Sequence, residues 1–225
     1  SSINHLFALL EMAKKEGQKK VFIHFFADGR DAPEKSALKY VGMIEKKIKK
    51  TGIGKIASVV GRYYAMDRDS EYSRTKKAYD LLTLGTGRQA ESAKKAIELA
   101  YKEGDITDYY IEPTAITKNG KLIATINDND AIIFFNTRTD RIRQIIKCFV
   151  SKKFSEIKLE KRPKILFCSF VSSDKEINEK ELLVAFDPFK INNNLGTVIS
   201  KAGLKQLRIA ETDKFHHVTY FFNSQ

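Results

Sequence analysis

The feature that most constrains the fold is the alternation of short apolar runs with longer amphipathic segments. Four apolar runs are rich in Val, Ile and Phe and end at polar or glycine-containing stretches; they span 20–26, 55–60, 131–136 and 164–171. Runs of this length and composition are typical of strands that are buried on both faces of a sheet. We therefore predict these four segments as strands of a central sheet.

Segments with apolar residues at helical spacing lie between and around these runs. Helices are predicted at 3–16, 33–50, 70–84, 89–102, 142–150 and 195–202, and Gly17, Gly104 and Gly203 mark the ends of three of them. Strands that alternate with helices favour parallel pairing, with the helices on both faces of the sheet. The predicted fold is α/β: a three-layer α/β/α sandwich with a largely parallel central sheet.

The remaining segments are shorter and less regular. The stretch 109–126 is strand-like, and Asn119-Gly120 within it favours a hairpin turn. A polar loop is predicted at 172–180. Beyond it the pattern changes, and we predict a short strand, a linker and two further strands around a polar turn; these span 182–186, 188–194, 204–210 and 218–222.

The charge balance indicates an anionic partner. The 225 residues include 40 Lys and Arg against 28 Asp and Glu, which gives a formal net charge of +12. An excess of this kind suits a phosphorylated metabolite, a nucleic acid or a membrane surface. Much of it lies in lysine runs such as 46–50, which are most simply solvated helix faces.

Cysteine content and hydropathy indicate a cytoplasmic protein. Cys148 and Cys168 lie in apolar surroundings without CxxC spacing, and we interpret both as buried side chains in a reducing compartment. There is no signal-peptide pattern and no apolar run of about 18 residues, so we expect a soluble protein that makes no membrane contact. An amphipathic pattern begins already at Ile3, which suggests a piece of a longer protein.

Arginines follow the three strongest predicted strands. The loops after 20–26, 55–60 and 131–136 contain the pairs Arg30 and Asp31, Arg62 and Arg68, and Arg138 and Arg141. Parallel strands end at one edge of a sheet, where open α/β sheets bind their ligands, so these loops should converge. Arginine binds oxyanions in a bidentate manner, and five guanidinium groups exceed what one phosphate needs. We predict a small substrate that carries both a phosphate and a carboxylate.

Other interpretations of these residues remain open. One alternative is that the arginines only form internal ion pairs, and the two alternatives for Asp31 are that it accepts a hydrogen bond from a substrate hydroxyl or that it only holds an arginine in place. A basic nucleic-acid-binding module is the main alternative function, but it predicts exposed aromatic residues, which here are limited to Tyr63 and Tyr64. The His216-His217 pair is a poor metal site, because neighbouring residues of a strand point to opposite faces.

Four long strings resemble one known enzyme family. They are HFFADGRD at 24–31, GRYYAMDRD at 61–69, FFNTRTDR at 134–141 and GLKQLRIAETDKFHHVT at 203–219. Together they resemble the 2,3-bisphosphoglycerate-independent phosphoglycerate mutases, which interconvert 3-phosphoglycerate and 2-phosphoglycerate. Their order is the family order, and they extend over nearly the whole chain.

The resemblance implies a domain organisation and a set of substrate contacts. The family has an alkaline-phosphatase-like domain and an inserted substrate-binding domain. Residues 1–187 resemble the inserted domain, and 188–225 resemble a hinge and the first strands of the returning phosphatase-like domain. The family's substrate contacts correspond to residues in all four strings: Arg30, Asp31, Arg62, Arg68, Arg138, Arg141 and Lys214.

The resemblance also implies what this chain does not contain. The family uses a serine nucleophile, two divalent metal ions (manganese or magnesium) and no 2,3-bisphosphoglycerate. The serine, the metal ligands and a substrate-contacting histidine before the first helix match no residue of this chain. We therefore expect the chain to bind phosphoglycerate without catalytic or metal-binding residues of its own, to require the phosphatase-like domain as its partner, and to be monomeric.

Overall fold

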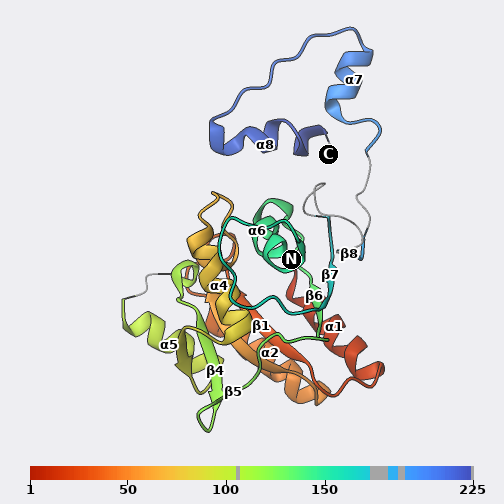
Figure 1. The fold of residues 1–225 in the computed structure, drawn as a ribbon. Coiled ribbons are helices and arrows are strands. Elements are labelled where there is room, and N and C mark those ends of the chain that lie inside the picture. Colours follow the sequence, from red (N-terminus) through yellow and green to blue (C-terminus); the bar gives the residue numbers. More distant parts are fainter. Residues whose placement is uncertain (105–106, 173–181, 187–190, 224–225) are drawn as a thin grey trace. The chain divides into compact units, whose positions relative to one another are not determined.

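The computed structural model describes residues 1–104, 107–172, 182–186 and 191–223. It divides into two compact units, Ser1–Ala185 and Phe186–Gln225, which are treated separately below (Figure 1). Most of the loop predicted at 172–180 and the first part of the linker predicted at 188–194 lie outside the described residues, as do the side chains of Asp213 and His216.

The first unit contains two hydrogen-bonded sheets rather than one continuous sheet. Their strands are β1 (Phe22–Ala27), β2 (Lys55–Gly61), β3 (Arg88–Ala90), β4 (Thr114–Lys118), β5 (Lys121–Leu122), β6 (Ala131–Phe134), β7 (Leu166–Ser169) and β8 (Leu183–Val184). The larger sheet has the order β1-β2-β4-β3 with β5 beside β4, and the smaller has the order β6-β7-β8. Four of the six pairings are parallel, which confirms the largely parallel arrangement.

Helices cover both faces of these sheets. They are α1 (Ile3–Lys15), α2 (Ala37–Thr51), α3 (Arg62–Ala65), α4 (Tyr72–Leu84), α5 (Ala93–Lys102), the short 3₁₀ helix η1 (Asp108–Tyr110) and α6 (Thr139–Val150). One apolar cluster joins α1, α2 and α5 to the strands, and a second joins α3, α4 and α6 to them (Figure 1). The predicted α/β fold is therefore confirmed.

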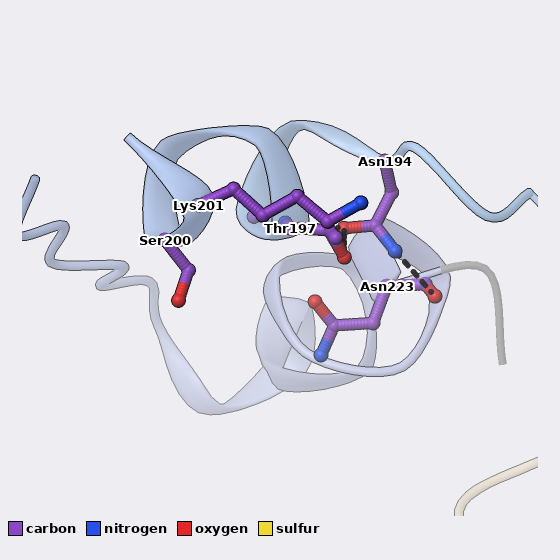
Figure 2. A pocket seen from close by; sticks show the side chains of 6 residues that line it. Asn194, Thr197, Ser200, Lys201 and Asn223 are labelled. Atoms are coloured by element: carbon purple, nitrogen blue, oxygen red, sulfur yellow. Dashed lines mark hydrogen bonds between the residues drawn. The ribbon is translucent and has the colours of Figure 1, made fainter. Parts of the chain in front are cut away.

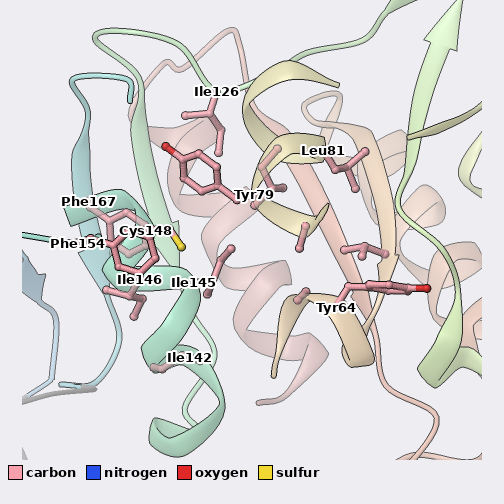
Figure 3. Packing of buried hydrophobic residues seen from close by; sticks show 14 of the residues in the cluster. Tyr64, Tyr79, Leu81, Ile126, Ile142, Ile145, Ile146, Cys148, Phe154 and Phe167 are labelled. Carbon is pink, nitrogen blue, oxygen red and sulfur yellow. The ribbon is translucent and has the colours of Figure 1, made fainter. Parts of the chain in front are cut away.

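Strand β2 shows how the two clusters are separated. Val59 and Val60 are both fully buried, yet Val59 belongs to the cluster with α1, α2 and α5 and Val60 to the cluster with α4 and α6. Successive side chains of a strand point to opposite faces, so a strand that is apolar at every position must be covered on both sides. Figure 3 shows the second cluster, where Tyr79 of α4 lies near Ile145 of α6.

The hairpin predicted at Asn119-Gly120 is confirmed. The two residues connect β4 to β5, which pair in antiparallel orientation. Their φ angles are +52° and +72°. Positive φ at both turn positions is the requirement of a type I′ turn, which Asn and Gly meet at low cost.

Two local predictions in the first unit are corrected. Residues 61–69 do not form a simple loop, because α3 makes one helical turn directly after β2. The helix predicted from residue 89 begins later: Arg88–Ala90 pairs with β4 as β3, and the hydroxyl of Ser92 then accepts a hydrogen bond from the amide of Lys95 to cap α5. A tertiary strand pairing and a capping serine decide the helix start.

The two strands predicted at 204–210 and 218–222 are absent from the described part of the second unit. Residues 204–210 pair with no described strand, and Leu207 and Ile209 are 87% and 84% exposed. Residues 218–222 instead belong to or follow α8 (Phe215–Val218) and η3 (Phe221–Asn223). An apolar alternation forms a strand only where a neighbouring strand supplies hydrogen-bond partners. Without one, 204–210 has no regular secondary structure, and 215–223 forms local helical turns.

A pocket of about 350 Å³ in the second unit lies between α7 (Leu195–Lys201) and η3. In Figure 2 the amide of Asn194 donates a hydrogen bond to the carbonyl of Asn223 at one end of this pocket. Asn194 also caps α7, since its side-chain oxygen accepts a hydrogen bond from the amide of Thr197 at 3.0 Å. None of the predicted site residues lines this pocket, and its asparagines serve to hold α7 and η3 together.

A close backbone approach fixes the end of β2. The amide of Gly61 donates a hydrogen bond of 2.7 Å to the carbonyl of Ile111, which follows η1. A Cβ atom on Gly61 would collide with the carbonyl oxygen of Tyr109 and lie 2.7 Å from the amide nitrogen of Ile111. Only glycine lets η1 pack this closely against the strand end.

We expect Gly61→Ala to destabilise the chain by about 1–3 kcal/mol, because a methyl group overpacks rigid backbone there. Gly42→Ala is the matched control: it lies within α2 with nothing within 4 Å of its Cβ position. It should stabilise the chain by about 0.5–1 kcal/mol, the helix-propensity difference. Urea unfolding of both variants checks this, and equal stability of the two would contradict it.

Candidate functional site

The three arginine-containing loops lie at one end of the strands. Ala27 and Gly61 are paired at the last position of the parallel β1–β2 ladder, so the loops that follow leave the sheet at the same level. The third loop follows β6, whose Phe134 ring lies 5.9 Å from the ring of Phe26. The predicted convergence of the three loops is therefore present.

Asp31 joins the first loop to the other two. One of its carboxylate oxygens accepts hydrogen bonds from Arg62 at 2.7 Å and from Arg138 at 2.6 Å. Arg62 also donates to the carboxylate of Asp28 at 2.5 Å. The two guanidinium groups that come from different strand ends are thus held by a single oxygen atom.

Asp140 makes the second connection between loops. It accepts a hydrogen bond from Arg68 at 3.0 Å and one from Nε of Arg138 at 3.3 Å. A continuous series of ion pairs therefore runs from Arg62 through Asp31, Arg138 and Asp140 to Arg68. We call these residues, together with Asp28 and Arg141, the arginine site.

Arg141 is the cation of this site without a carboxylate partner among the described residues. Its Nη1 donates to the backbone carbonyl of Met66 at 3.2 Å, while its buried Nε has no hydrogen-bond partner in the described chain. Burial lowers the pKa of the Arg141 guanidinium, and the positive charges of Arg68 and Arg62 lower it further. The group stays protonated, because arginine does not lose its proton in proteins. A buried positive charge of this kind favours an anion.

Arg62 is even more deeply buried, at 2% exposure, and its Nε likewise lacks a partner in the described part of the chain. Burial acts against its charge, but hydrogen bonds to Asp28 and Asp31 outweigh burial and raise the pKa of the guanidinium. Buried polar groups are nearly always hydrogen-bonded, so two unpartnered Nε–H donors in one cluster indicate a site for an oxyanion.

The structure brings together five of the seven predicted contacts: Asp31, Arg62, Arg68, Arg138 and Arg141. Arg30 lies in the first loop and is exposed, without an ion-pair partner among the described residues. Lys214 belongs to the second unit, where its ammonium group lies 3.7 Å from Glu211. The four arginines of the arginine site lie among the carboxylates of Asp28, Asp31 and Asp140, and Asp69 lies 4.0 Å from Arg68.

Comparisons with known proteins identify the family of the chain. A family model described as "BPG-independent PGAM N-terminus" matches residues 1–175. The chain belongs to the 2,3-bisphosphoglycerate-independent phosphoglycerate mutase family. The resemblance drawn from the four strings is thereby confirmed.

Individual members of the family match nearly the whole chain. A mutase of this name from Acetivibrio thermocellus is 49% identical over 220 residues, which cover 97% of this chain and 42% of the relative. One from Methanosarcina barkeri is 48% identical and is covered to 43%. A Leishmania mexicana phosphoglycerate mutase, crystallised at low cobalt concentration, has a TM-score of 0.84 at 28% identity, with 98% of this chain and 41% of that one covered. The chain thus spans less than half the length of these mutases.

Sequence reasoning missed the aspartates that organise the arginine site. Asp28 and Asp140 stand beside the arginines in the strings at 24–31 and 134–141, but they were not singled out. Their signal was available: a loop that buries several arginines near a sheet edge needs carboxylates nearby. Asp31 was expected either to bind substrate or to hold an arginine, and in this structure it holds two.

Metal binding and membrane insertion receive no support from the described residues. No group of three or more His, Cys, Asp or Glu side chains in this part of the chain could hold a metal ion. No described helix is long and apolar enough to cross a membrane. Both cysteines are free; Cys148 is buried, as predicted, whereas Cys168 is only half-buried, which corrects the prediction that both are buried.

We expect the pKa of Asp140 to lie below 3.8. Burial acts to raise the pKa, but the hydrogen bond from Arg68 and the neighbouring guanidinium charges outweigh it. This lowered value implies a contribution to stability that is complete above pH 3.8 and is lost as the pH falls through the lowered pKa. Carboxyl NMR titration measures the pKa directly.

Arg68→Ala should raise the pKa of Asp140, because the largest lowering contribution disappears while burial remains. Arg88→Ala is the control, since Arg88 pairs with Glu103 and Glu112 outside the arginine site and should leave the titration unchanged. A pKa of Asp140 that does not respond to Arg68→Ala contradicts the assigned contact.

Proposed function

We propose that this chain is the substrate-binding part of a phosphoglycerate mutase that interconverts 3-phosphoglycerate and 2-phosphoglycerate. The observation that supports this most strongly is the cluster of arginines from three loops. Two of these arginines have buried Nε–H groups without a partner among the described residues. Membership of the mutase family supports the substrate class. A phosphoglycerate carries a phosphate and a carboxylate, which suits several guanidinium groups held apart by aspartates.

The proposed role of these residues is to position substrate and to offset its charge. Arg62 and Arg141 would hold an anionic group through their inward donors, and Arg30, Arg68 and Arg138 would complete the contacts. Asp31 keeps Arg62 and Arg138 at a fixed spacing. Because these groups are ordered before substrate arrives, little reorganisation is needed during phosphoryl transfer.

The covalent chemistry is proposed to lie outside this chain. The family resemblance implies a phosphoserine intermediate and two divalent metal ions. No group of three or more described His, Cys, Asp or Glu side chains could hold such an ion. In this proposal the serine takes the phosphoryl group, the glycerate reorients while the arginines hold it, and the group returns to the other hydroxyl. Independence of 2,3-bisphosphoglycerate is part of the relatives' names.

The second unit is proposed as the hinge and the beginning of the phosphatase-like domain. Exposed apolar side chains at Leu207 and Ile209 support this, since such positions normally pack against further protein. Lys214 is proposed as a further substrate contact from the family resemblance, and closure of the hinge in the whole mutase would exclude water so that transfer prevails over hydrolysis. A cytoplasmic location and a monomeric state remain predictions from the sequence.

The nucleic-acid alternative receives no support. Arg62, Arg68 and Arg138 are gathered in one cluster and paired with aspartates. Tyr63 packs against Tyr64, Tyr109 and the guanidinium of Arg74. A compact paired cluster suits a small anion rather than a phosphate backbone.

We expect the isolated chain to bind 3-phosphoglycerate weakly and to show no mutase turnover, because it positions substrate without a nucleophile. Calorimetry at millimolar ligand tests binding, and a coupled assay tests turnover. Absence of heat would count against the binding site, whereas turnover by the pure chain would show that the nucleophile lies within it.

In the full-length mutase, we expect Arg62→Ala to lower kcat/KM more than tenfold, as for a charge-assisted contact of about 1.5–3 kcal/mol. Arg88→Ala is the matched control, because Arg88 also pairs with two carboxylates but lies on β3 away from the three loops. Equal kcat/KM for the two variants would reject the role of Arg62.

A further inference from the structure

Asp67 is a buried carboxylate next to a proposed substrate contact, with no role assigned so far. Its side chain is 2% exposed and stands directly before Arg68. One oxygen accepts hydrogen bonds from the amides of Asp69 at 3.1 Å and Glu71 at 3.0 Å. The chain therefore folds back over this carboxylate immediately after Arg68.

The other carboxylate oxygen of Asp67 is fixed from a different direction. It accepts a hydrogen bond from Arg74 of α4 at 3.1 Å. The guanidinium of Arg74 in turn lies 4.2 Å from the ring centre of Tyr63, in α3. Asp67 is thus held between the two helices that flank the loop, and its position does not depend on Arg68.

The loop also carries a backbone conformation that needs support. Ser70 has a φ angle of +63°, a left-handed conformation that residues other than glycine seldom adopt. The two amides that donate hydrogen bonds to Asp67 belong to the residues on either side of Ser70, so the same carboxylate fixes both ends of this turn. Arg68 then leaves the turn toward Asp140, where its Nη1 lies 3.0 Å from the carboxylate.

We propose that Asp67 is a positioning residue for Arg68: it fixes the 66–71 turn so that the Arg68 guanidinium is held in the arginine site before substrate binds. This proposal rests on the proposed function of that site and adds a residue that does not itself touch substrate. The turn is fixed by the carboxylate oxygen that accepts hydrogen bonds from the two amides, and the ion pair with Arg74 only orients the carboxylate.

A double-mutant cycle in the full-length mutase tests this. Asp67→Ala should lower kcat/KM about tenfold, the scale of a contact that is misplaced by a fraction of an ångström. In an Arg68→Ala background the same substitution should change kcat/KM by no more than about twofold, because residues that act through one another are not additive. A general loss of packing would instead lower kcat/KM equally in both backgrounds, and that outcome would overturn the proposal.

Three further variants separate the amide contacts from the ion pair. Arg74→Met leaves the amide contacts but removes the counter-charge of a buried carboxylate, so it should destabilise the chain while kcat/KM of the folded enzyme stays within about twofold of the wild type. Asp67→Asn keeps an oxygen acceptor for the two amides and should recover most of the activity lost in Asp67→Ala. Asp67→Glu keeps the charge but displaces the oxygens by one methylene, and it should lose activity; it carries the test if Asp67→Ala does not fold.

The possible failures are distinguishable. If Arg68→Ala alone leaves kcat/KM unchanged, the substrate role of Arg68 is wrong and the positioning role falls with it. If Arg68→Ala lowers kcat/KM but Asp67→Ala and Asp67→Glu do not, the substrate role stands and only the role of Asp67 is overturned.

Discussion

The shared carboxylate oxygen of Asp31 is the interaction on which the site depends. It accepts hydrogen bonds from Arg62 and Arg138, which come from strands of two different sheets. No described backbone hydrogen bond joins β1 to β6, so side chains connect the sheet edges here. Guanidinium groups placed this close repel one another unless a carboxylate lies between them. Asp31 and Asp140 supply that charge, and the three loops can therefore converge.

Burial gives these ion pairs their importance. Surface ion pairs contribute little to stability, but a guanidinium at 2% exposure cannot remain without a counter-charge. Arg62 has Asp28 and Asp31 as counter-charges, whereas Arg141 donates only to the neutral carbonyl of Met66 among the described residues. The free-energy cost of burying Arg141 without a carboxylate is offset by the stability of the rest of the fold. Such a cost is common at functional sites, where stability is given up for pre-formed binding groups.

The sequence predicted the strands and the arginine loops well because both depend on local patterns. Apolar runs such as 55–60 read as strands whatever their neighbours, and loops after parallel strands must share an edge. It could not predict partner-dependent features. β3 forms because β4 lies beside it and supplies hydrogen-bond partners. Residues 204–210 stay unpaired because no described strand lies beside them. The aspartate partners were missed for the same reason, since Asp31 and Arg138 are separated by 107 positions along the chain.

The same aspartates set a limit on how the site can bind. Every arginine donor that now contacts Asp31 or Asp140 must be shared with, or released to, an incoming anion. The Nε–H groups of Arg62 and Arg141 need not be released from a carboxylate, because they are buried and have no partner among the described residues. An oxyanion that enters the site therefore meets the aspartate-bound donors of the more exposed Arg138 first, where its charge competes with that of the carboxylates. Hydrogen bonds to the two buried Nε–H groups break no ion pair, but they require a side-chain movement that opens these donors to the anion.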